Sequence, residues 1–182
     1  MLGSIGVLHG SISVHGFAGW LQGTSVSDSI KSASWVIPLL QSIHILTIGV
    51  VFVSCLMIML RVLGVMRTDE PAEAVWRRFA PWMWSGLVVM AATGITLVVG
   101  EPEREFGTIS FWLKMPLVAI GVTGTALYGR SLRSAAGGAP AVFPMSAKAA
   151  SVLIVILWLA VIFLGRAIAY DKQVWGALSP HA

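Results

Sequence analysis

Residues 34–64 read SWVIPLLQSIHILTIGVVFVSCLMIMLRVLG, and this stretch decides the fold. From Val36 to Leu60 it contains no charged side chain. At about 1.5 Å per residue, a helix of this length crosses about 30 Å of hydrocarbon. Trp35 stands at one end, where indole rings prefer the membrane interface, and Arg61 closes the other. The stretch therefore predicts a transmembrane helix over about residues 35–60.

The composition of the whole chain favours the same environment. Of its 182 residues, 57% are hydrophobic and only 11% are charged, and the mean hydropathy is +0.85. A surface of this composition would not be wetted by water, which excludes a soluble globular domain. The formal charge of +4 does not indicate a nucleic-acid partner, because the basic residues lie in loops beside apolar segments, where they set the topology.

Three further apolar segments are expected to span the membrane, at about residues 82–99, 111–128 and 149–168. Between the first two spans, Pro71 breaks the loop, and residues 72–79 are expected to form a short surface helix. Residues 1–33 are less apolar than a span and lack the basic region of a secretory signal, which favours a partly helical interfacial segment. Together these elements predict an all-α, four-helix up-down bundle that forms a single membrane domain over residues 1–182.

The distribution of Lys and Arg indicates the orientation of this bundle. The loops after the first and third spans hold seven of them, Arg61, Arg67, Arg77, Arg78, Arg130, Arg133 and Lys148. The other side holds four, Lys31, Arg104, Arg166 and Lys172. Because positive charge is enriched on the cytoplasmic side, both termini and the acidic loop at residues 100–110 are expected outside the cytoplasm.

His44 is the only histidine in any predicted span. It is expected about 12–15 Å below the outer end of its helix, where a polar side chain is costly and points to a function. Neutral imidazole is a good ligand for haem iron or copper. The alternative is a structural histidine that bonds a facing helix, for instance at Thr93 or Thr96. Gln41 and Thr47 share its helix face, so either side chain is placed to orient the ring.

Lys114 enters the third predicted span from the same outer side, about one and a half turns deep. Its ammonium either reaches back to the interface or pairs with an anion inside the bundle. No Asp or Glu lies in a predicted span, so that anion would come from the acidic loop, a lipid, or a bound molecule such as a haem propionate. His44 and Lys114 are expected at similar depth, and a ligand with a metal centre and acidic edges would satisfy both.

Small residues and methionines complete the set of candidate site residues. The second span carries Gly86 and the run from Ala91 to Gly94, which favours close helix packing or leaves room for a flat cofactor beside Gly94. A second iron ligand is left open, with candidates in His9, His15 and His181 on the outer side and in Met83, Met90 and Met115 in the spans. Copper handling would use His44 with Met57, Met90 or Met115.

Several classes of site lack their necessary residues. The single cysteine, Cys55, excludes an internal disulfide and any iron–sulfur cluster ligated by several cysteines of this chain. No Ser-His-Asp arrangement, Gly-rich phosphate loop, zinc-ligand spacing or pair of intramembrane carboxylates is present. These absences argue against hydrolase, ATPase and proton-relay functions.

The pattern W-x-x-P-x-x-x-x-x-H over residues 35–44, followed by L-R-x-L-G at 60–64, resembles a family of small uncharacterised bacterial membrane proteins with four helices. Gly94 and Lys114 match two further features of that family, a glycine in the second span and a lysine that opens the third. The chain departs from the pattern at Met59, where an acidic residue is common, and at 122–123, where an Asn is common. Such proteins also look distantly like the copper-resistance-D and b-type cytochrome membrane bundles, which implies a haem or copper role for His44.

The leading hypothesis is a b-type haem protein of the bacterial inner membrane, with His44 as axial ligand and Lys114 near a propionate. It would carry electrons between a membrane donor and a periplasmic acceptor, or sense a redox ligand. A different class is a homo-oligomeric structural or transport protein without a cofactor, in which His44 and Lys114 line a pore or bind lipid. Copper handling is the third alternative.

Overall fold

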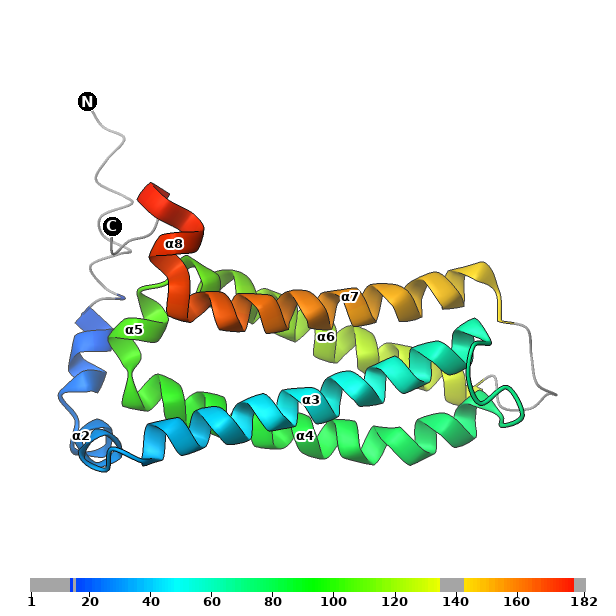
Figure 1. The fold of residues 1–182 in the computed structure, drawn as a ribbon, viewed down its shortest axis with the longest axis horizontal. Coiled ribbons are helices and arrows are strands. Elements are labelled where there is room, and N and C mark those ends of the chain that lie inside the picture. Colours follow the sequence, from blue (N-terminus) through cyan, green and yellow to red (C-terminus); the bar gives the residue numbers. More distant parts are fainter. Residues whose placement is uncertain (1–13, 15, 135–142, 179–182) are drawn as a thin grey trace. The chain divides into compact units, whose positions relative to one another are not determined.

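The protein is all-α in a computed structural model that describes residue 14 and residues 16–134 and 143–178. Four long apolar helices are packed as a bundle, namely α3 (Val36–Leu63), α4 (Ala72–Gly100), α6 (Ile109–Ser134) and α7 (Met145–Ala167) (Figure 1). The shorter elements are a helical segment at residues 16–22, α2 (Ser25–Ser32), α5 (Pro102–Phe106), η1 (Ile168–Tyr170), α8 (Asp171–Trp175) and η2 (Gly176–Leu178). The predicted fold class is confirmed.

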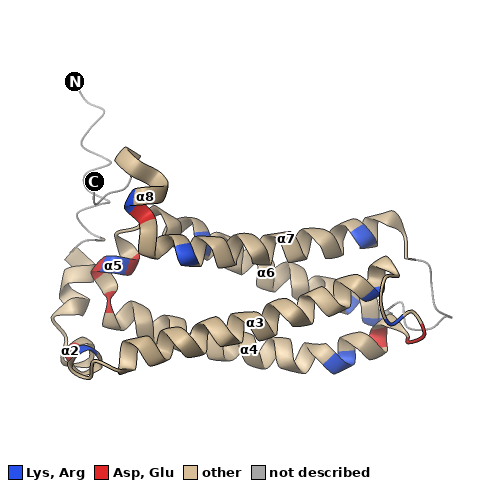
Figure 2. Ribbon diagram, viewed as in Figure 1, with Lys and Arg blue, Asp and Glu red and all other residues tan. Residues whose placement is uncertain are grey.

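The four long helices have the length and composition of membrane spans. Within the described residues, four helical stretches are long and apolar enough to cross a bilayer, and this supports a multi-pass membrane protein. Figure 2 shows that Lys, Arg, Asp and Glu lie near the ends of these helices, while their middle parts carry other residues. Because a charged side chain is costly in hydrocarbon, this distribution is the one expected of membrane spans.

The second span begins earlier than the sequence predicts. Residues 72–79 do not form a separate surface helix but are the first turns of α4, which continues through Pro81. The reason lies in packing, because Val75, Trp76 and Ala80 before the proline and Met83 after it are buried in the same core. A shared buried face on both sides of the proline offsets the backbone hydrogen bond that its ring removes.

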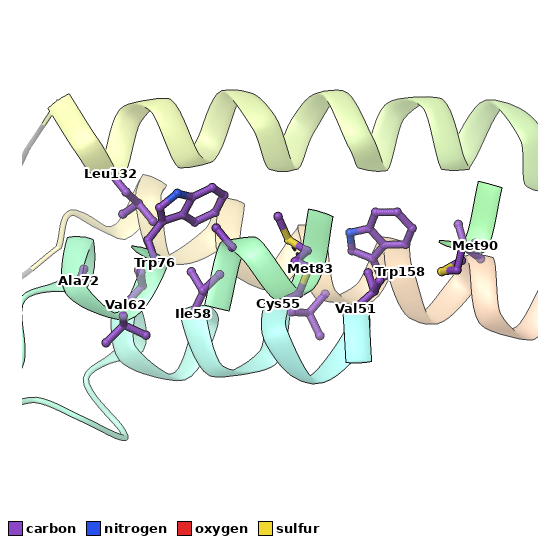
Figure 3. Packing of buried hydrophobic residues seen from close by; sticks show 14 residues of the cluster. Val51, Cys55, Ile58, Val62, Ala72, Trp76, Met83, Met90, Leu132 and Trp158 are labelled. Carbon is purple, nitrogen blue, oxygen red and sulfur yellow. Dashed lines mark hydrogen bonds between the residues drawn. The ribbon is translucent and has the colours of Figure 1, made fainter. Parts of the chain in front are cut away.

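The described chain divides into two compact units. Of the described residues, the first comprises 14, 16–44, 91–113 and 164–178, and the second comprises 45–90, 114–134 and 143–163. The second unit contains the main hydrophobic core, in which Val51, Cys55 and Ile58 of α3 pack with Trp76 and Met83 of α4 (Figure 3). In the same core, the indole of Trp158 donates a hydrogen bond to Thr125 Oγ1 over 3.2 Å.

A buried arginine closes the corner between α3 and α4 in the second unit. Gly64 has φ +78°, a left-handed conformation that ends the helix, and Val65 N–H bonds the Leu60 carbonyl at 2.9 Å. Arg61 is only 4% exposed and donates from Nε to the Glu70 carbonyl at 2.6 Å. The L-R-x-L-G motif is therefore a helix-ending motif whose arginine holds the following loop, a role beyond that of a basic residue marking topology.

Aromatic rings and one buried carboxylate organise the first unit. Phe17, Phe106 and Phe111 form edge-to-face contacts, with ring centroids 5.9 Å and 5.4 Å apart. Asp171 is buried, and its carboxylate accepts hydrogen bonds from the Ser110 hydroxyl (2.9 Å) and backbone N–H (3.3 Å). Trp175 Nε1 donates to the same hydroxyl at 2.9 Å. These contacts fix α8 against the start of α6.

Candidate functional site

His44 has a specific polar partner on a facing helix. Its Nδ1 lies 2.8 Å from Thr93 Oγ1, which joins α3 to α4 within the first unit. The imidazole is half-buried and the threonine is buried. Of the two threonines that the sequence nominated, Thr96 instead donates its hydroxyl to the Ala92 carbonyl of its own helix at 2.9 Å. The His44–Thr93 pair is therefore the centre of the candidate site.

The chemistry of this pair depends on the direction of its hydrogen bond. A threonine hydroxyl in a helix commonly donates to a carbonyl of the preceding turn and is then an acceptor for other groups. With Thr93 as acceptor, the His44 Nδ1 carries the proton and Nε2 carries the lone pair. That tautomer is the one that ligates a metal through Nε2, with the second nitrogen oriented by a protein oxygen.

Gly94 lies beside the imidazole, and its predicted role next to a cofactor stays a prediction. A methyl group at Gly94 would lie 3.5 Å from His44 Cε1, which is an ordinary van der Waals distance. Glycine is therefore not sterically required for the helices to approach each other here. Gln41 is half-buried one turn before His44 on α3, and its role in orienting the ring stays a prediction.

The remaining predicted site residues are distributed differently. Lys114 is half-buried on α6 and belongs to the second unit, so its expected proximity to His44 stays a prediction. His9, His15 and His181 lie outside the described residues. Met83 and Met90 are buried in the core of the second unit, where Met83 Sδ accepts a contact from the Cys55 thiol at 3.6 Å. These two methionines serve the packing of that core.

Two further observations bear on metal binding and on what sequence reasoning missed. Among the residues described by the structure, no group of three or more His, Cys, Asp or Glu is placed to hold a metal ion. The buried Asp171 was also not among the residues that the sequence singled out. The only available signal was an acidic residue directly after the last span, and that position alone does not reveal a partner such as Ser110.

Comparison with known families gives one match. Residues 21–171 match DUF6644, which is described as a family of unknown function. The matched region includes His44, Thr93 and all four long helices. Comparison with curated proteins and with solved structures gave no match.

Proposed function

The chain belongs to the DUF6644 family of unknown function, and for this member we propose a membrane b-type haem protein in which His44 is an axial ligand of the iron. The bond between His44 Nδ1 and Thr93 Oγ1 is the observation that supports the proposal. Bound haem would supply one-electron exchange at its iron, which suits electron transfer to a membrane or periplasmic partner, or redox sensing.

The chemistry of the groups around His44 suits an imidazole that would ligate a haem iron. Histidines that ligate a metal usually donate their second ring N–H to a protein oxygen, which fixes the ring and raises its basicity. Thr93 is such an oxygen, and it approaches Nδ1, so Nε2 is the nitrogen that would meet the iron. Gly94 adds no side chain beside the ring. In this proposal Gln41 helps to orient the imidazole.

A histidine with a purely structural role, linking α3 to α4, would make the same bond to Thr93. The experiment must therefore distinguish the role of Nδ1 from the role of Nε2. The full chain, expressed with a haem precursor and purified in detergent, is expected to show a Soret band and a pyridine haemochrome of b type. His44→Asn keeps a hydrogen-bonding group near the position of Nδ1 but has none at Nε2. This variant is expected to lose the Soret band and to keep the thermal stability of the wild type purified without haem.

Thr93→Val provides the matched control, because it removes the bond to Nδ1 and leaves Nε2 in place. It is expected to retain haem and to shift the midpoint potential, since a ligand's hydrogen bond tunes the iron. A wild-type preparation that stays colourless and has a defined oligomeric size would contradict the haem proposal. It would favour a homo-oligomeric structural or transport protein without a cofactor.

The proposed location is the bacterial inner membrane, with both termini outside the cytoplasm. The excess of Lys and Arg in the loops after the first and third spans supports this orientation. Alkaline phosphatase fused after Ala182 is therefore expected to be active, and green fluorescent protein at the same position to be dark. The reverse pattern from the two fusions would overturn the orientation.

A further inference from the structure

A pocket lies at the start of α8 in the first unit, apart from the His44–Thr93 pair. Its volume is about 340 Å³, and its polar lining comes from Arg104 and Thr108 on one side and from Asp171, Lys172 and Gln173 on the other. Ligand pockets commonly begin at about 300 Å³. Figure 2 marks the basic and acidic residues of α5 and α8.

Both cations of the pocket have donors to offer a ligand. Arg104 forms an ion pair with Glu101 through one of its terminal nitrogens, and its side chain is 41% exposed. A guanidinium has five N–H donors, so one such contact leaves others that can be directed to a bound anion. Lys172 is exposed and brings three more donors. An arginine together with a lysine is a frequent combination for binding phosphate groups.

The acidic groups of the pocket restrict the charge of its ligand. The Asp171 carboxylate lies in the pocket lining and accepts hydrogen bonds from the Ser110 hydroxyl and N–H. With this carboxylate in the wall and Glu101 beside Arg104, a ligand with two negative charges would be repelled more than a ligand with one. The pocket is therefore better suited to a phosphodiester, which carries one charge, than to a phosphate monoester.

The position of the pocket along the chain matches the level of lipid headgroups. Residues 168–173 follow directly after the apolar helix α7, and Trp175 comes one turn later. Trp112, half-exposed with its indole donating to the Phe106 carbonyl at 2.9 Å, belongs to the same unit. Tryptophans of this kind are typical of the membrane interface. We propose that the pocket binds a phosphodiester group, with the phosphate held by Arg104 and Lys172. This proposal does not depend on haem binding.

The test measures retention of a phospholipid by the full chain in native mass spectrometry, with phosphatidylglycerol added to the detergent-purified protein. A cation near a lipid phosphate contributes about 1 kcal/mol, which corresponds to about a fivefold change in affinity. Lys172→Gln and Arg104→Gln are each expected to lower the affinity about fivefold, and Lys172→Arg to leave it unchanged. Arg166→Gln is the matched control, because Arg166 lies at the same end of α7 but stacks on Tyr170, outside the pocket lining.

A second arm uses the soluble diester glycerophosphoglycerol to separate two sources of the same group. A headgroup site would be supported if the protein binds the lipid but not the soluble diester, and if Lys172→Gln and Arg104→Gln both weaken binding of the lipid. Binding of the soluble diester with the same losses would support a site for a water-soluble phosphodiester. Equal retention by the wild type, both glutamine variants and the Arg166→Gln control, in both arms, would overturn the proposal.

Discussion

Replacing Gly129 by alanine is expected to lower the free energy of unfolding by about 2 kcal/mol, even after the gain in helix propensity that alanine brings. A methyl group at this position would lie 2.0 Å and 2.2 Å from Cζ2 and Cη2 of the Trp76 ring. That ring is only 4% exposed and packs in the same core as Val62 and Leu132. The indole therefore cannot move aside without displacing its neighbours, because protein cores are packed at crystal-like density.

Gly124→Ala on the same helix is the matched control for this prediction. A methyl group at Gly124 would meet no heavy atom within 4 Å, so this substitution brings only the helix-propensity gain of up to about 1 kcal/mol. Thermal denaturation in detergent, followed by the loss of monodisperse protein, should shift downward for Gly129→Ala and stay level or rise for Gly124→Ala. Equal shifts in the two variants would contradict the packing of Trp76 on α6.

Arg61→Met is expected to destabilise the protein by about 2–3 kcal/mol, because the side-chain donor to the Glu70 carbonyl is lost. Methionine keeps the apolar stem of the side chain, so the loss reports mainly on the guanidinium. The loop between α3 and α4 should also open more readily, which limited proteolysis with trypsin would detect as faster cleavage after Arg67.

Arg78→Met controls for the removal of a positive charge from the same loop region. Arg78 pairs with the Glu70 carboxylate at 3.2 Å, but its side chain is 52% exposed. An exposed ion pair contributes less than about 1 kcal/mol, so this variant should resemble the wild type in stability and cleavage rate. Equal stability and equal cleavage rates in the two variants would show that Arg61 acts only as a surface charge. They would contradict a stabilising role for its buried hydrogen bond to Glu70.

The hydrogen-bond partner of His44 could be predicted only in part from the sequence. A histidine in an apolar span implied a polar partner on a facing helix, for instance Thr93 or Thr96 of the second span. Those residues are three positions apart and share a helix face, so the sequence pattern does not distinguish them. The relative axial position of α3 and α4 selects Thr93 as the partner.

Residue composition and periodicity by themselves determined that this chain forms four apolar helices of membrane-spanning length, because the absence of charge over such lengths is a local property of the sequence. Only the tertiary structure decided which glycines on α6 lie against an indole, that Arg61 is buried, and that Asp171 bonds Ser110. Each of those outcomes depends on the rotation and register of one helix against another. These are set by packing among residues far apart in the chain, so no local pattern reports them.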